Sequence, residues 1–298
     1  MSTSTERINI SVIVPTFNRP QQLHETLSSL IQITEISEIV VINDCPEVEI
    51  KFDHKKVQIY TNEKRCGEAT SINLGFSKIR NRFFAIISDD DPQFFDWLPT
   101  IVKQIRAFPD FIAYYPSTRI LQGGKVKEII VAPEFNQLLF LKTLKSYCLA
   151  GVVIDRGKIP NYVTDLRPDG VLFPNDLIQW LDLSKYGNFL AVPNSFANWF
   201  IHEGQLTSTL LPDQKKQMFV KNLMAWSNDN PFKFSAYFEA AIFLRSIQFR
   251  QEGFLRNIFE SIKAFRHILN ESQNRWLFIT SIPKILFMLL VMKFKLSN

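Results

Sequence analysis

The sequence predicts an α/β fold in which a mostly parallel sheet is flanked by helices. Short β-branched runs alternate with segments whose apolar residues recur at helical spacing, which is typical of right-handed βαβ units. One run, 83–87, stops at three consecutive carboxylates, Asp89–Asp91. Its length and composition suit a central strand that is covered on both faces. Acids that follow such a strand lie at the carboxyl edge of the sheet, where open α/β sheets bind ligands.

The first half of the chain supplies most of the predicted elements. The run 8–15 predicts the first strand, and apolar residues at helical spacing between Leu23 and Ile31 predict the helix after it. Later elements are expected as strands at 36–42, 57–60, 83–87 and 189–193, and as helices around 72–79 and 95–107.

Three strand ends are expected to meet. Because parallel strands place their carboxyl ends on one edge, the first, second and fourth strands should bring Thr16, Asp44 and Asp89–Asp91 together. The side chains that select a ligand there would come from connecting segments such as Ser117–Ala132, which we expect to be a loop.

Composition limits the class of protein. The chain has 298 residues and 46% hydrophobic content, enough for one sizeable domain or one domain with an appendage. Three cysteines, Cys45, Cys66 and Cys148, show neither a CxxC pair nor zinc spacing, so we expect reduced thiols and a cytoplasmic protein. Residues 1–9 are polar and lack the apolar segment of a signal peptide.

The net charge of +5 is concentrated at one end of the chain. Residues 245–298 contain nine basic and three acidic residues, so the rest of the chain is close to neutral. A nucleic-acid partner is therefore not expected for the main body.

The three consecutive acids predict a cation site. Clustered carboxylates repel one another, and a hard divalent cation supplies the missing positive charge through oxygen ligands. Mg²⁺ typically takes one or two carboxylates and leaves its other positions to water and phosphates, which indicates a phosphate-bearing ligand. Neither GxGxxG nor GxxxxGK[ST] occurs, so no glycine loop is expected to hold the phosphates. The alternative is a solvated acidic turn, or an N-cap for the helix around 95–107.

These residues resemble the family 2 glycosyltransferases, which have the GT-A fold, use nucleotide-sugar donors and depend on Mn²⁺ or Mg²⁺. The resemblance covers roughly residues 8–210, and it rests on Val12–Pro20, on Val40–Asp44, on Gly67 with Asn73 and Gly75, and on Ser88–Asp91.

The resemblance implies a set of donor-binding residues. In this family, positions such as Thr16 and Asp44 contact the base and ribose of the donor, although Asp44 has an alternative as a turn residue and Asn73 as a helix-surface residue. The residues implied to bind the nucleotide are Pro15, Thr16, Asn18, Arg19, Asp44, Gly67, Asn73, Asp89 and Asp90.

The resemblance also implies metal ligands, and residues 88–91 can be aligned with the acidic motif of the family in two registers. Asp89 and Asp91 can be read as the Asp-x-Asp motif, with His202 as a further ligand. In the other register Ser88 takes the place of the first acid, and Asp90 and Asp91 are the two acids that act in the site. The segment Trp199–Gly204 resembles the aromatic-x-x-His segment of the family, whose imidazole ligates the cation or bonds to a phosphate. The alternative for this histidine is a structural role.

The resemblance also implies a general base. The family usually has an acidic pair at a helix start, and Asn175 replaces the first acid here, which leaves Asp176. A carboxylate within hydrogen-bond reach can take the proton of an attacking hydroxyl. The alternative is that Asp176 complements the helix dipole. Other candidates are Asp165, Asp169 and Asp182.

The last part of the chain differs from the rest in its pattern of apolar and basic residues. We expect a GT-A domain at 1–230 and an α-helical extension at 231–298, because apolar residues recur at helical spacing between Leu255 and Leu269. The run 285–292 is too short to span a bilayer, and lysines follow it. The extension would either lie on an anionic membrane surface, at the inner face of the plasma membrane, or dock on the catalytic domain or on a second copy of the chain.

The resemblance implies a transferase that moves a sugar from a nucleoside diphosphate sugar to a hydroxyl of a glycan or lipid-linked acceptor. Inversion is usual in the family. The Gln-x-x-Arg-Trp signature of processive members is absent, so single addition is expected. The alternatives are a sugar-1-phosphate nucleotidyltransferase and a catalytically silent, nucleotide-binding membrane scaffold.

Overall fold

The computed structural model describes residues 7–136, 140, 150–160, 175–203, 205, 218–219, 221–223 and 226. The chain divides into two compact units, and the first comprises residues 1–140 and 145–209. Every helix and strand named below belongs to this first unit. The expected C-terminal extension at 231–298 lies outside the described residues, as do Asp165 and Asp169.

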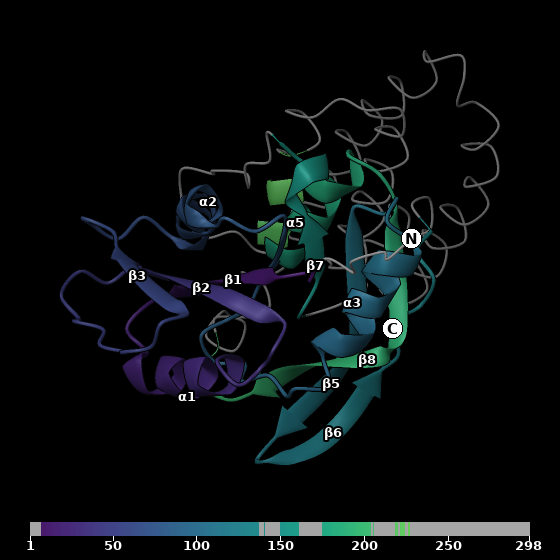
Figure 1. Cartoon of the computed structure of the whole chain (residues 1–298). Helices are drawn as coiled ribbons and strands as arrows, with labels where there is room; N and C mark the ends of the chain where they lie inside the picture. Colours follow the sequence, from purple (N-terminus) through teal and green to yellow (C-terminus); the bar gives the residue numbers. More distant parts are fainter. Residues whose placement is uncertain are drawn as a thin grey trace, which may run out of the picture. The chain divides into compact units, whose positions relative to one another are not determined.

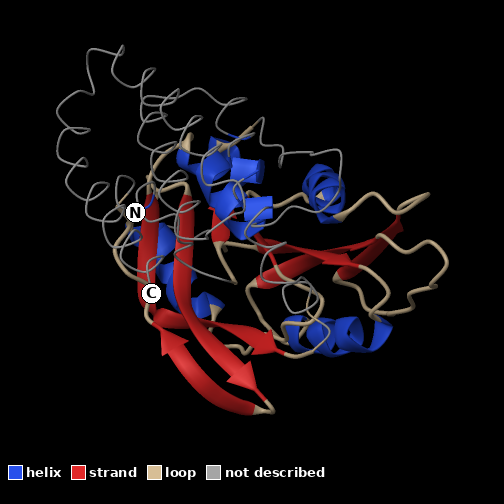
Figure 2. Ribbon diagram, turned by 180° about the vertical axis from the view of Figure 1, so that it is seen from behind, coloured by secondary structure: helices blue, strands red, loops and turns tan. Residues whose placement is uncertain are grey.

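An eight-stranded mixed sheet forms the centre of the first unit (Figures 1 and 2). Seven strands follow the order β3-β2-β1-β4-β7-β5-β6, and the eighth, β8, pairs with β5. The strands are β1 (Ile10–Thr16), β2 (Ile36–Asn43), β3 (Val57–Thr61), β4 (Phe83–Ile86), β5 (Ala113–Gln122), β6 (Lys125–Ile130), β7 (Val153–Asp155) and β8 (Phe189–Ile201).

The first four strands form the parallel half of the sheet. β1 pairs in parallel with β2 on one side and with β4 on the other, and β2 pairs in parallel with β3. Thr16 at the end of β1 lies opposite Asn43 at the end of β2, so the two strands end together. This half confirms the predicted α/β architecture, with each strand boundary within two residues of the expected one.

The other half of the sheet is mixed. The short strand β7 pairs antiparallel with both β4 and β5, and β8 runs parallel to β5. β8 is thirteen residues long and continues to Ile201, whereas the sequence indicated only its first five residues. The extension matters because it carries Asn198 and Phe200 to the acidic segment after β4.

Helices cover both faces of the parallel half. Apolar residues of α1 (Pro20–Leu30) and α3 (Leu98–Ala107) share one core with Val12 and Val14 of β1. The opposite face carries α2 (Glu68–Lys78), and α1 and α2 lie on opposite sides of β1 and β2 in Figure 1. Gly75 of α2 packs so closely on Ile13 that a Cβ would lie 2.4 Å from its Cγ2 atom, so this contact requires glycine. A further helix among the described residues of this unit is α5 (Asn175–Ser184).

The segment Ser117–Ala132 is not the loop that the sequence suggested. It forms most of an antiparallel hairpin of β5 and β6. Gly123 and Gly124 connect the strands and have φ values of 58° and 75°. Two consecutive residues with positive φ are what a two-residue type I′ turn requires, and glycine adopts them without steric cost.

Within the described part of the chain, no helix has both the length and the apolar composition needed to cross a membrane.

Candidate active site

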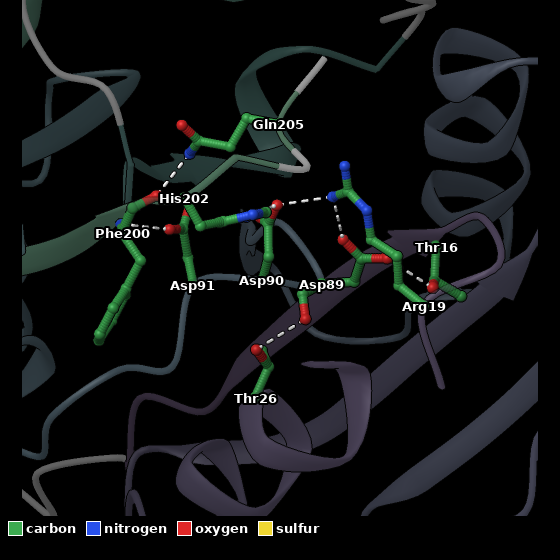
Figure 3. A network of polar contacts seen from close by, with 9 residues as sticks. All are labelled: Thr16, Arg19, Thr26, Asp89, Asp90, Asp91, Phe200, His202 and Gln205. Atoms are coloured by element: carbon green, nitrogen blue, oxygen red, sulfur yellow. Dashed lines mark hydrogen bonds and ion pairs between the residues drawn. The ribbon is translucent and has the colours of Figure 1, made fainter. Parts of the chain in front are cut away.

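The acidic segment after β4 sends its three carboxylates in different directions (Figure 3). Asp89 turns toward β1, Asp90 lies between Arg19 and His202, and Asp91 turns toward β8. The segment therefore joins residues from the start, the middle and the end of the first unit. The predicted meeting of strand ends is confirmed for Thr16 and Asp89.

Both carboxylate oxygens of Asp89 have hydrogen-bond partners within the protein. Its Oδ2 accepts a hydrogen bond from Thr16 Oγ1 at 2.6 Å, and its Oδ1 faces Arg19 Nη1 at 3.1 Å. Thr26 of α1 donates to the backbone carbonyl of Asp89 at 2.9 Å. Burial raises the pKa of Asp89, and the nearby Asp90 carboxylate raises it further, although the bonds from Thr16 and Arg19 oppose the shift.

Asp90 receives two potentially cationic groups on one oxygen. Arg19 Nη1 lies 2.6 Å from Asp90 Oδ2, and His202 Nε2 lies 2.8 Å from the same atom. The side chains of Arg19 and His202 are 26% and 30% exposed, whereas that of Asp90 is 7% exposed. Solvent therefore reaches this part of the site along the arginine and the histidine.

Asp91 is the most deeply buried carboxyl group of the segment. Its Oδ1 accepts the backbone N–H of Phe200 at 2.7 Å. Burial raises the pKa of Asp91 well above its ordinary value, and the neighbouring Asp90 carboxylate adds to the shift. Three acids thus share one guanidinium and one imidazole, so the segment carries an excess of negative charge.

Asp44 follows β2 and organises the loop before α2. Its carboxylate accepts three hydrogen bonds, from Asn62 Nδ2 at 2.8 Å and from the backbone N–H groups of Cys66 at 2.7 Å and Gly67 at 2.8 Å. The N–H of Asp44 in turn donates to the Thr16 carbonyl at 2.9 Å. Asp44 therefore ties the ends of β1 and β2 to the start of α2.

The remaining predicted donor-binding residues surround these strand ends. Pro15 is buried in β1, and Asn18 is exposed with a φ of 53°, in the left-handed region. Gly67, with a φ of 87°, immediately precedes α2, and Asn73 lies half-buried within that helix. Phe17 is exposed and carries the Arg65 guanidinium 4.2 Å from its ring centroid.

Residues 11–148 match the sequence profile described as glycosyl transferase family 2. They contain all of β1 except Ile10, all of β2, the acidic segment, and the residues that donate hydrogen bonds to Asp44. This part of the chain belongs to glycosyl transferase family 2.

Two curated relatives of the family 2 domain come from Haemophilus influenzae, and each is described as an uncharacterized glycosyltransferase. One is 30% identical over 134 residues, which are 42% of this chain, and the other is 26% identical over 113 residues, which are 36% of it. The chain spans 38% of the length of each relative.

Solved glycosyltransferases share the fold of the family 2 domain. Staphylococcus aureus TarS 1–349 in complex with UDP-GlcNAc gives a TM-score of 0.53 at 19% identity, over 81% of this chain and 71% of TarS. The mannosyltransferase PcManGT of Pyrobaculum calidifontis, with GDP-Man and Mn²⁺, gives 0.50 at 12% identity, over 91% of this chain and 84% of that one. At these identities the likeness shows the GT-A fold.

The acidic segment of the family 2 domain fits a divalent cation that is shared with a ligand. Among the described residues, no group of three or more His, Cys, Asp or Glu side chains is arranged to hold a metal ion. A cation held by one or two carboxylates, with phosphate and water completing its shell, needs no such group. The excess negative charge and the raised pKa values of Asp89 and Asp91 are what such a cation would relieve.

Asp176, the candidate base, lies in the first turn of α5 and is half-buried. Asp182, one of the other candidates, faces Lys185 instead, with Oδ1 2.8 Å from its Nζ. His202 lies one residue past β8 and contacts Asp90 rather than Asp89 or Asp91.

Two buried side-chain amides lie beside the acids and were not expected from the sequence. Gln93 is 2% exposed and Asn198 is 0% exposed, and they bond to each other across 105 residues of sequence. No local pattern predicts such a pair, because it depends on the unexpected length of β8.

Proposed function

We propose that this chain transfers a sugar from a nucleoside diphosphate sugar to a hydroxyl of a glycan or lipid-linked acceptor, by single addition and with inversion. The observation that carries the proposal is the meeting of the three acids after β4 with Thr16 and Arg19 from the start of the chain and with His202 after β8. This edge of the sheet has more negative charge than its neighbours balance, as expected for a site completed by a cation and a diphosphate.

The donor nucleoside would bind over the ends of β1 and β2. Thr16 and Asp44 lie there side by side, joined by the hydrogen bond between their backbones. Arg19 reaches over the acidic segment and is partly exposed, so it can face a phosphate as well as Asp90. The aromatic ring of Phe17 is exposed beside these groups and offers a stacking surface.

Asp90 and Asp91 are the pair that we assign to Mn²⁺ or Mg²⁺. Both oxygens of Asp89 accept hydrogen bonds from the protein, whereas Asp90 Oδ1 and Asp91 Oδ2 accept none from the described residues. This favours the register in which Ser88 takes the place of the first acid. When bound, the cation would stabilise the negative charge that develops on the departing diphosphate. His202 is assigned to hold Asp90 in place.

Asp176 is assigned to the acceptor side. An acceptor hydroxyl must lose a proton as it attacks the anomeric carbon, and a carboxylate at a helix start can take that proton. Attack from the face opposite the departing diphosphate inverts the anomeric configuration.

The test of the function is release of nucleoside diphosphate from a panel of UDP-, GDP- and dTDP-sugars, with Mn²⁺ or Mg²⁺ and with EDTA. The expected result is cation-dependent release with one donor class. A thermal-shift series with UDP, GDP and dTDP identifies the base before any acceptor is known. Unchanged melting with all three nucleotides in the presence of cation would overturn the proposal.

The Asp176→Ala variant tests the base. General-base catalysis typically contributes about 10²–10⁴-fold, so turnover should fall by at least about 10²-fold while donor binding stays the same. An unchanged turnover would reject Asp176.

The segment 231–298 carries a separate proposal, a helical extension on an anionic membrane surface at the inner face of the plasma membrane. Its basic residues and apolar runs support this assignment. Loss of binding to anionic liposomes after truncation behind Asn270 is the expected result. Retained liposome binding would reject it, and a changed oligomeric state would assign the segment to contacts between copies.

A further inference from the structure

Side chains of the segment after β4 form hydrogen bonds with backbone N–H groups of β8, as the backbone of a neighbouring strand would. Asn198 and Phe200 are two residues apart in β8, so their N–H groups point to the same side of the strand. The Phe200 N–H donates to Asp91 Oδ1 at 2.7 Å, and the Asn198 N–H donates to Gln93 Oε1 at 2.8 Å. Asp91 and Gln93 are also two residues apart, so acceptors and donors match in spacing.

Gln93 makes more hydrogen bonds at this junction than Asp91 does. Its Nε2 donates to the Asn198 carbonyl at 3.0 Å, so the one amide satisfies both backbone groups of Asn198. The same Nε2 lies 2.8 Å from the Asp91 carbonyl, and the backbone N–H of Gln93 donates to Ser29 Oγ at 2.9 Å. The amide thus links the backbone of the acidic residue directly to β8.

Asn198 completes the attachment from the other side. Its Nδ2 donates to the Pro92 carbonyl at 2.9 Å, and its Oδ1 accepts from Arg119 Nη1 of β5 at 3.0 Å. Arg119 is in turn paired with Asp96 at 2.8 Å. The bonds to Asn198 and Phe200 together fix three consecutive residues, 91–93, on β8. Because Gln93 and Asn198 are almost fully buried, water cannot readily replace these bonds.

We propose that Gln93 is a positioning residue that fixes the Asp91 carboxylate on β8 and thereby presents Asp91 Oδ2 to the divalent cation. This inference rests on the proposed function. Gln93 acts through Asp91, in the way that groups behind a metal ligand orient that ligand. The orientation is specified because the Phe200 N–H takes one carboxylate oxygen and leaves the other for the cation.

The test replaces Gln93 with methionine, which keeps the length of the side chain and removes the amide. Mn²⁺ binding is measured by calorimetry with UDP, GDP or dTDP present, whichever the wild-type chain binds. Loss of a group that orients a metal ligand typically weakens metal binding by about 10–100-fold, and this is the change expected for Gln93→Met. Hydrogen exchange of the Asn198 and Phe200 amides should become faster in the metal-free protein. Binding of the nucleotide alone should not change.

A matched control separates positioning from general destabilisation. Glu38 is a buried, hydrogen-bonded residue near the start of β2, away from the acidic segment. Glu38→Gln is expected to lower the melting temperature without changing the affinity for Mn²⁺. An equal loss of Mn²⁺ affinity in both variants would overturn the inference.

Asn198→Leu provides a second variant that nearly preserves side-chain volume and adds no charge. It removes the bonds to the Pro92 carbonyl and from Arg119, and it keeps the backbone groups that meet Gln93. It should weaken Mn²⁺ binding less than Gln93→Met does, and it decides the question if Gln93→Met does not fold. Unchanged Mn²⁺ affinity and unchanged Phe200 exchange in the folded variants would overturn the inference. If the wild-type chain binds neither nucleotide nor Mn²⁺, the proposed function itself fails.

Discussion

The two ends of the parallel sheet bury carboxylates in different ways. At the amino end, Glu38 pairs with Arg80 at 2.7 Å, and Asp155 pairs with Arg82 at 2.7 Å. Each of these acids has an arginine of its own. At the carboxyl end, three acids share Arg19 and the imidazole of His202.

The pKa values follow this difference. Burial opposes ionisation of Glu38, but bonds from Ser11 and Arg80 outweigh it and lower the pKa of Glu38. At the other end, burial and neighbouring carboxylates raise the pKa values of Asp89 and Asp91. A buried acid with its own arginine is stabilised in its charged form, whereas acids with too little compensation are expected where a ligand would bring positive charge.

The largest effect, a loss of turnover, is expected for a substitution at the carboxyl end of the sheet. Asp91→Asn keeps the acceptor for the Phe200 N–H and removes the charge that would face the cation. Turnover should fall by about 10²–10³-fold, the scale of losing one preorganised electrostatic contact to the transition state. Cation-dependent release of nucleoside diphosphate measures it. Activity within twofold of wild type would mean that Asp91 has only a structural role, like the acids at the amino end.

A smaller effect on stability is expected at the amino end. Arg82→Met leaves the fully buried Asp155 without its bidentate partner. Because the Arg82 side chain is 58% exposed, the cost should stay below the roughly 3–5 kcal/mol of a fully buried pair, at about 2 kcal/mol. Thermal unfolding should show a fall of about 4–8 °C. Turnover per folded molecule should not change, and a large loss of turnover would place Arg82 in the machinery of the site.

The smallest effect is a gain in stability. A raised pKa means that the folded state holds the Asp91 proton more tightly than the unfolded state does, so wild-type stability falls as pH rises from the ordinary aspartate range through the raised pKa. Asp91→Asn carries no such proton. In EDTA at pH 7 it should therefore unfold at a higher temperature than wild type.

The same pair of proteins supplies the control for this pH effect. The difference should shrink as the pH falls below about 4, because Asp91 is then increasingly protonated in the unfolded state as well as in the folded state. A difference that is independent of pH would mean that the asparagine changes packing rather than charge.

Much of the fold and part of the site could be predicted from the sequence, because both follow local rules. Hydrophobic runs predicted β1, β2 and β4, and the direction of parallel strands predicted that Thr16 and Asp89 would meet. The register of the acids could not be predicted, because it depends on the turn of a few backbone bonds after β4. Only the structure shows Asp89 directed at Thr16 and Asp91 directed at Phe200.

The missed features have different causes. The Gly123–Gly124 pair is a recognisable hairpin signal, so the hairpin of β5 and β6 could have been found from the sequence. The bonds between Gln93 and Asn198 could not, because their partners lie in separate elements and have no shared spacing. The length of β8 was also hidden, since Pro193 resembles a strand end.

The bond between Asp91 and Phe200 spans 109 positions of the chain. During synthesis the acidic segment leaves the ribosome long before β8 does, so the nascent protein passes through a stage in which Asp91 lacks the Phe200 N–H and Asp90 lacks His202. A fragment that stops at residue 148 would remain at that stage. The smallest piece worth expressing for metal and nucleotide binding should therefore extend past His202.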